Sequence, residues 1–76
     1  MNYNNIIDVI QTGNNLRKVR EEHFMTIEEV SIVMKGVSSQ FIALMEKGKF
    51  IPTLEYIIDF CNQFNKSIDE IVISNL

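Results

Sequence analysis

Cysteine, histidine and tryptophan are scarce in this sequence, which has one cysteine, one histidine and no tryptophan among its 76 residues. Because the single cysteine, Cys61, cannot form a disulfide within the chain, we expect a protein of the reducing cytoplasm. The single histidine, His23, has no cysteine, aspartate or second histidine at the spacing of a zinc site. The sequence therefore predicts neither a bound metal nor another cofactor.

Residue patterns typical of catalysis are also lacking. Neither Cys61 nor Ser31 has a plausible base near it in the sequence, and no pair of carboxylates lies in a cleft-forming context. Residues 1–11 lack the charged and apolar regions of a signal peptide, and the apolar run at 41–45 is far shorter than a membrane span. We expect no enzyme activity, no export and no membrane insertion.

Positive charge is in deficit over the whole chain, since ten acidic residues against seven basic ones give a net charge of −3. This balance argues against indiscriminate binding to polyanions, which depends on lysine and arginine. The stretch 35–49 is an exception, because it contains Lys35, Lys47 and Lys49 against one acid, Glu46. Any binding to a polyanion would depend on this local excess of positive charge.

Residues that interrupt helices are few, with one proline and three glycines, and no strict apolar and polar alternation reaches the length of a strand. Helices with short connections are therefore the expected structure. Ile6, Ile7 and Ile10 recur at helical spacing in a short N-terminal segment that we expect to end near Gly13. A longer helix follows from Leu16.

Side chains that cap helices mark the starts of later elements. Thr26 is followed three residues later by Glu29, and Ser67 by Glu70. Each pair can form a capping box, in which the two side chains satisfy free backbone donors at a helix start. Ser38 is suited to cap a further helix between them.

Helix ends and one long apolar stripe complete the pattern. Gly48 and Asn65 can end helices because both residue types tolerate the left-handed conformation. Pro52 begins an element whose apolar residues follow helical spacing, namely Leu54, Ile57, Ile58, Cys61 and Phe64. We predict an all-α fold of five main helices and no sheet, preceded by the short N-terminal segment, in a single domain over residues 1–76 with its core in 12–72.

Several short motifs follow one another along the chain. They are Leu16-Arg17-x-x-Arg20, Met25-Thr26-x-Glu28-Glu29-Val30-Ser31, Gly36-Val37-Ser38, Ile42-x-x-Met45-Glu46-Lys47-Gly48-Lys49, Pro52-Thr53-Leu54 and Phe64-Asn65-x-Ser67-Ile68-Asp69-Glu70-Ile71. Their order and spacing resemble those of a lambda-repressor-like, Cro-type helix-turn-helix domain. The resemblance covers residues 12–72 and points to the small bacterial and phage regulators of that family.

The resemblance implies a regulator that binds operator DNA. Residues 26–35 and 38–47 would form the two-helix unit, with the second helix in the major groove. Gln40 can pair with adenine, while hydroxyls and lysines can hold phosphates. The residues expected at or beside the DNA are Thr26, Lys35, Ser38, Ser39, Gln40, Phe41, Ala43, Leu44, Lys47 and Lys49. A near-palindromic operator read by a homodimer is expected for such a domain.

The resemblance also implies a structural ion pair between Arg20 and Glu46 that joins two helices. One departure concerns Phe24, which stands where the family has a glycine at a helix end. Since a bulky residue resists the left-handed conformation, we expect this helix end to be built differently. The connection at Lys35 and Gly36 is also one residue longer than the commonest family form.

Apolar residues in unusual places raise an alternative function. Ile27 stands where a polar phosphate contact is usual, and Phe41 and Leu44 lie on the reading helix. Together with Ile32 they would form an apolar patch that docks a partner regulator protein. In this alternative, the chain is a helix-turn-helix modulator or antirepressor.

The two ends of the chain are more apolar than chain ends need to be. Two explanations are open: the ends pair across a two-fold axis, or they close the core of their own chain. The residues concerned are Ile6, Ile7, Val9, Ile10, Ile71, Val72, Ile73 and Leu76.

Overall fold

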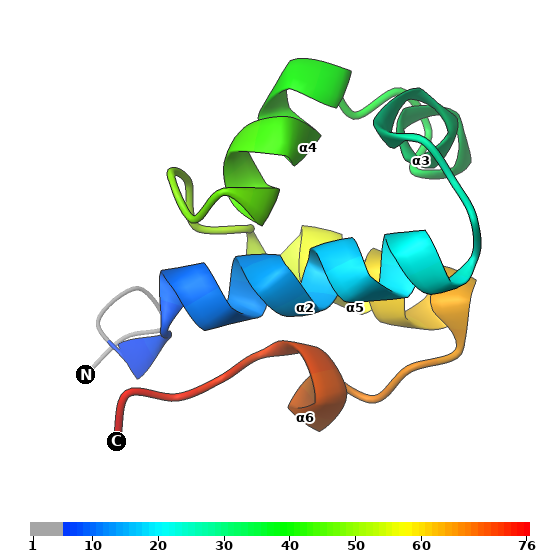
Figure 1. The fold of residues 1–76 in the computed structure, drawn as a ribbon. Helices are drawn as coiled ribbons and strands as arrows, with labels where there is room; N and C mark the ends of the chain where they lie inside the picture. The colour runs from blue at the N-terminus through cyan, green and yellow to red at the C-terminus, as the bar shows by residue number, and fades with distance from the viewer. Residues whose placement is uncertain (1–5) are drawn as a thin grey trace.

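The computed structural model describes residues 6–76. Its five helices are α2 (Val9–Glu22), α3 (Ile27–Val33), α4 (Ser39–Glu46), α5 (Leu54–Phe64) and α6 (Ile68–Ile71). The helices α2 and α5 lie on opposite sides of the core, with α3 and α4 above them and α6 below in Figure 1. Within residues 6–76 the chain has no strand beyond one isolated antiparallel bridge, so the predicted all-α fold of five helices is confirmed.

The helix α2 runs without interruption through Gly13, so the predicted end near that residue is wrong. Asp8 caps α2 by accepting a hydrogen bond of 3.0 Å from the backbone N–H of Gln11. A Cβ atom on Gly13 would overlap the backbone carbonyl oxygen of Met45 in α4. The glycine is therefore needed for close helix packing rather than for a helix end. The part of the predicted N-terminal segment that precedes residue 6 lies outside the described residues.

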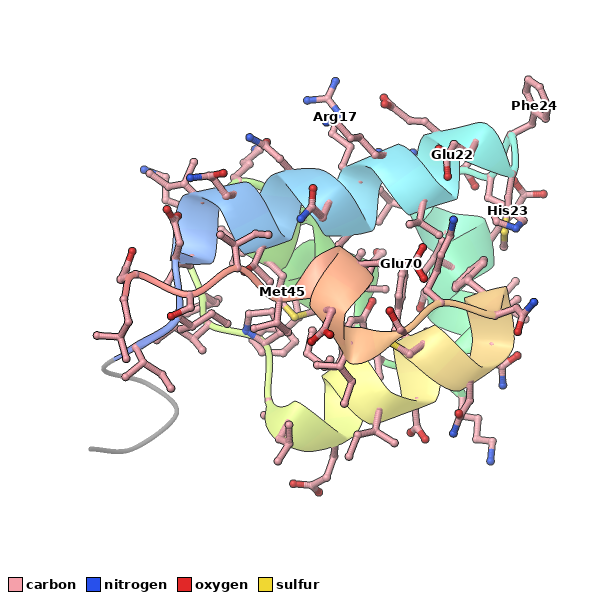
Figure 2. The ribbon with its side chains drawn as sticks, turned by 90° about the horizontal axis from the view of Figure 1, so that it is seen from below. Arg17, Glu22, His23, Phe24, Met45 and Glu70 are labelled. Carbon is pink, nitrogen blue, oxygen red and sulfur yellow. The ribbon has the colours of Figure 1, made fainter. Side chains whose placement is uncertain are left out.

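The end of α2 differs from the sequence prediction, because Phe24 does adopt the left-handed conformation, with φ of 55°. Two backbone hydrogen bonds hold it there, from Phe24 N–H to Glu21 O at 3.0 Å and from Met25 N–H to Arg20 O at 3.2 Å. This is the Schellman pattern, which usually has glycine at the left-handed position. The Phe24 side chain is 93% exposed and projects from the end of the helix (Figure 2).

The connection between α3 and α4 contains two successive left-handed residues, Lys35 with φ of 60° and Gly36 with φ of 83°. Their N–H groups donate to the last carbonyl groups of α3, at Ile32 and Ser31. The chain then turns into α4, whose first turn is capped by the Ser38 hydroxyl. This two-residue left-handed turn sets the angle between the two helices.

The other predicted helix signals are present in the structure. Thr26 and Glu29 form a full capping box, with hydrogen bonds of 2.8 and 3.1 Å. The Glu70 carboxylate accepts from the backbone N–H and the hydroxyl of Ser67. Gly48 ends α4 and Asn65 ends α5, both in the left-handed conformation. These predictions are confirmed.

The core is assembled from one face of every helix. Cys61 is buried in it as predicted, and burial raises the pKa of its thiol above the ordinary value. Ile32 takes no part, since its side chain is 77% exposed on α3. The buried apolar residues are Ile7, Leu16, Val19, Val30, Met34, Ile42, Met45, Tyr56, Ile57, Phe60, Cys61, Phe64 and Ile71.

The two ends of the chain are joined to each other. An antiparallel bridge pairs Ile7 with Ser74, and it is flanked by backbone hydrogen bonds of 2.7 Å from Asp8 to Ile73 and from Asn75 to Ile6. We call this bridge with its two hydrogen bonds the terminal clasp. Of the apolar residues at the two ends, Ile7 and Ile71 are buried in the chain's own core, whereas Ile10 and Leu76 are 63% and 85% exposed, so closure of the core accounts for only part of the set.

Candidate nucleic-acid interface

The surface built on α4 contains most of the residues predicted to contact DNA. One side of α4 is fixed in the core by Ile42 and Met45, and its backbone rests on Gly13 of α2. The opposite side of α4, which lies at the edge of the molecule in Figure 1, therefore faces solvent. Gln40 and Lys47 on that side are exposed. A helix held on one face and free on the other can enter a groove without any change of fold.

The two hydroxyl groups predicted at helix starts already serve as caps. The Thr26 hydroxyl accepts from the N–H of Glu29, and the Ser38 hydroxyl accepts from the N–H of Phe41 at 3.3 Å. A hydroxyl that accepts one hydrogen bond still has its own proton to donate. Both groups can therefore cap a helix and hold a phosphate oxygen at the same time.

Three exposed lysines surround the ends of α3 and α4. Lys35 lies in the turn that precedes α4, Lys47 is the C-cap residue of α4, and Lys49 follows in the next turn. None of the three has an ion-pair partner within 4 Å in the described part of the chain. Their charges are therefore available to an anionic ligand.

The apolar residues of the predicted patch are mostly not free. Ile27 and Phe41 pack against the core and are only partly exposed, and Leu44 is also partly buried. The Phe41 ring lies 5.4 Å from the ring of Phe50, which covers part of it. Ile32 is the one member of the predicted patch whose side chain is mainly in solvent.

The Arg20 and Glu46 side chains form a bidentate ion pair, with Nε to Oε2 at 2.8 Å and a second guanidinium nitrogen to Oε1 at 2.9 Å. A third donor of Arg20 reaches the carbonyl oxygen of Met25 at 3.0 Å. The Glu46 side chain is only 7% exposed. The pair thus connects α2, the start of α3 and the end of α4.

The ion pair also changes the titration of its neighbours. The hydrogen bond from Arg20 to Glu46 raises the pKa of the Arg20 guanidinium further above its ordinary value. Tyr56 is buried near Glu46, and its pKa is raised first by burial and then by the Glu46 charge. The Arg20 guanidinium and the Tyr56 hydroxyl therefore keep one ionisation state over the pH range in which the fold is stable.

Sequence reasoning missed one cation of this surface, Arg17 on α2. Arg17 lines a groove that also includes Ala43 and Lys47 of the α4 region. The helical period of the sequence could have indicated this position. Arg17 lies about one turn after Gly13 and nearly one turn before Arg20, so the three residues share one side of α2. Gly13 and Arg20 both face α4.

Two kinds of feature are absent from the described residues. No group of three or more His, Cys, Asp or Glu side chains within residues 6–76 is placed to hold a metal ion. Over the same residues, none of the helices has the length and apolar character needed to span a membrane.

A comparison with protein families gives a match to the helix-turn-helix family of Cro/C1 type over residues 16–71, from the middle of α2 to the end of α6. This chain belongs to that helix-turn-helix family. In family terms, α3 and α4 are the helix-turn-helix itself, and the lysines described above lie at its turn and at its far end.

Solved structures share this helix-turn-helix fold. The restriction-modification controller protein C.AhdI from Aeromonas hydrophila is 19% identical with a TM-score of 0.76, and the match covers 84% of this chain and 96% of that one. The clp gene regulator ClgR from C. glutamicum is 21% identical with a TM-score of 0.71, over 80% and 78% of the two chains. The DNA-binding domain of BldD is 17% identical with a TM-score of 0.75, over 86% and 93%. A comparison with curated proteins found no match.

Proposed function

We propose that this helix-turn-helix protein is a sequence-specific DNA-binding transcriptional regulator that reads its operator with α4. The observation that carries the proposal is the group of three lysines around α4, which have no ion-pair partner within residues 6–76, in a chain of net charge −3. Two of the structurally similar proteins are a restriction-modification controller and a gene regulator, and the third is a DNA-binding domain. We propose further that the protein acts in the cytoplasm and without catalysis.

The division of roles follows from the chemistry of each side chain. Gln40 lies near the start of α4 and can accept from and donate to one adenine edge in the major groove. Ser39 and Ala43 lie beside it on the same helix. Lys47 and Lys49 carry no such information and would neutralise phosphates, which fixes the orientation of the protein on the duplex.

A second copy of the chain is part of the proposal, because two copies related by a two-fold axis read a near-palindromic operator. The terminal clasp and the core already take up Ile7 and Ile71 within one chain. Exposed apolar side chains remain on α5, at Leu54 and Ile58, and just before it at Phe50. We propose this strip, Phe50 with Leu54 and Ile58, as the contact between copies.

The alternative of a modulator that docks a partner regulator receives less support. It needs Ile27, Phe41 and Leu44 to be free, and all three are partly buried. It also gives no role to the lysines, since apolar anchors provide most of the free energy of a protein interface.

A mobility-shift titration with the DNA that flanks the protein's own gene tests the proposal. Gln40→Ala should relax base preference, and Lys47→Ala should weaken binding to all sequences and reduce the salt slope by about 0.9. Phe41→Ser should have a smaller effect on DNA binding, provided the variant folds. A wild-type protein that gives no shift at low salt, but a stoichiometric complex with a neighbouring regulator, would overturn the proposal.

A further inference from the structure

The groove between α2 and α4 differs from the other grooves of this molecule because it opens beside the reading side of α4. It is lined by Arg17, Arg20, Ile27, Ala43, Glu46 and Lys47. At its floor, the charges of Arg20 and Glu46 compensate each other in the bidentate pair. Two further cations line the groove: Lys47 has no ion-pair partner among the described residues, and Arg17 is paired only with the exposed Glu21.

The Arg17 guanidinium is held by Glu21 but keeps most of its N–H donors available to an anionic ligand. Its Nε atom donates to Glu21 at 3.1 Å, one turn along α2, and the side chain makes no other hydrogen bond to residues 6–76. The side chain is 58% exposed, so this ion pair is weak and easily exchanged for another. The remaining four N–H donors can serve an anion bidentately, as guanidinium groups do with phosphate.

The position of Arg17 distinguishes it from the next cation along α2. Figure 2 shows Arg17 projecting from the edge of α2 away from α6. Lys18 is displaced by about 100° around the helix. It lines a different groove, which it shares with Lys66 and Glu70 on the α6 side. The two residues have the same charge and adjacent positions, but only one shares a groove with α4.

We propose that Arg17 is a DNA phosphate ligand, and that Glu21 holds its guanidinium in place until a phosphate displaces the carboxylate. The proposal rests on the proposed function, because it requires α4 to lie in the major groove. Ala43 lies on the reading side of α4 and Lys47 at its end. When α4 lies in the major groove of DNA, this groove of the protein therefore faces the DNA sugar-phosphate backbone that borders the major groove. Arg17 and Lys47 would then hold phosphates from the two sides of the groove.

Two matched pairs of variants test this assignment, with a short labelled duplex of mixed sequence and fluorescence anisotropy over a salt series. Arg17→Gln should reduce the slope of log affinity against log salt by about 0.9, whereas Lys18→Gln should leave the slope unchanged. Arg17→Lys should retain most of the slope, because it keeps the charge. Thermal melts of all variants control for folding, since neither residue is buried.

Glu21 provides the second pair. Glu21→Gln should tighten binding by about two- to five-fold more than Glu22→Gln, which removes the same charge on the α6 side. This difference should vanish in the Arg17→Gln background if Glu21 acts through Arg17. Equal slopes for Arg17→Gln and Lys18→Gln, with normal wild-type binding, would overturn the role of Arg17 alone. A wild-type protein without salt-dependent binding would overturn the proposed function as well.

Discussion

Gly13 of α2 touches the backbone of α4 at Met45 so closely that a Cβ atom has no room there. We therefore predict that Gly13→Ala destabilises the protein, although alanine favours a helix by about 1 kcal/mol over glycine. The added methyl group would force α2 and α4 apart, at a cost of about 1 to 3 kcal/mol. Urea denaturation measures the change, with Asn14→Ala on the exposed side of α2 as control. A gain in stability for both variants would contradict the contact.

Removal of either partner of the Arg20 and Glu46 pair should be far more harmful than removal of an exposed charge. Arg20→Ala leaves the Glu46 carboxylate buried without a partner, which costs about 3 to 5 kcal/mol. Arg17→Ala breaks an exposed pair on the same helix and should cost no more than about 1 kcal/mol. Thermal or chemical unfolding compares the two. Similar losses of unfolding free energy for both variants would show that burial of Glu46 does not increase the cost of removing its partner.

Phe24 should be replaceable by glycine with a gain in stability. A residue with a Cβ atom pays roughly 1 to 2 kcal/mol in the left-handed conformation, and the exposed ring recovers nothing by burial. Phe24→Gly should therefore raise the free energy of unfolding by about 1 kcal/mol. Phe24→Ala removes the ring but keeps the Cβ atom, so it should give no comparable gain. A gain from alanine equal to that from glycine would assign the effect to the ring instead.

The cap of α6 should depend on pH. Hydrogen bonds from the backbone and hydroxyl of Ser67 lower the pKa of the Glu70 carboxyl below its ordinary value. A group with a depressed pKa in the folded state stabilises the fold above its unfolded pKa and loses this effect as pH falls through the folded value. The difference in melting temperature between wild type and Glu70→Gln should thus be present at neutral pH and shrink in acid. A difference that grows on acidification would contradict this sign.

The proposed strip on α5 predicts a change of oligomeric state. Leu54→Ser with Ile58→Ser should give a monomer in sedimentation experiments under conditions where the wild type is a dimer. Ile32→Ser removes an even more exposed apolar side chain from α3 and should leave the dimer intact. A monomeric wild type, or an equal effect of Ile32→Ser, would exclude the strip as the contact between copies.

Features that depend on neighbouring residues were predictable from the sequence. The capping box of Thr26 with Glu29 and the left-handed ends at Gly48 and Asn65 arise from hydrogen bonds and conformations within a few residues. The sequence therefore contains all the information that places these helix ends. Local signals of the same kind also predicted α4 and its exposed polar residues.

Features set by distant contacts were not predictable in this way. Gly13 was expected to end a helix, because its contact with Met45 exists only after α4 has packed on α2. Phe24 is a separate and local case: it was expected to avoid the left-handed conformation, but the backbone hydrogen bonds from Phe24 to Glu21 and from Met25 to Arg20 outweigh the preference of its side chain. Arg17 was missed because its groove is formed jointly by α2 and α4.

The terminal clasp has a consequence for the order in which the fold opens. It joins residues near opposite ends of the chain, and the loop that it closes is the longest closed by backbone pairing among residues 6–76, so its formation is favoured only after the chain between them has folded. Opening it breaks two backbone hydrogen bonds and leaves the packing of α3 against α4 untouched. The amide protons of Asp8 and Asn75 should therefore exchange with solvent through local opening, while those of α4 exchange only when the whole core unfolds.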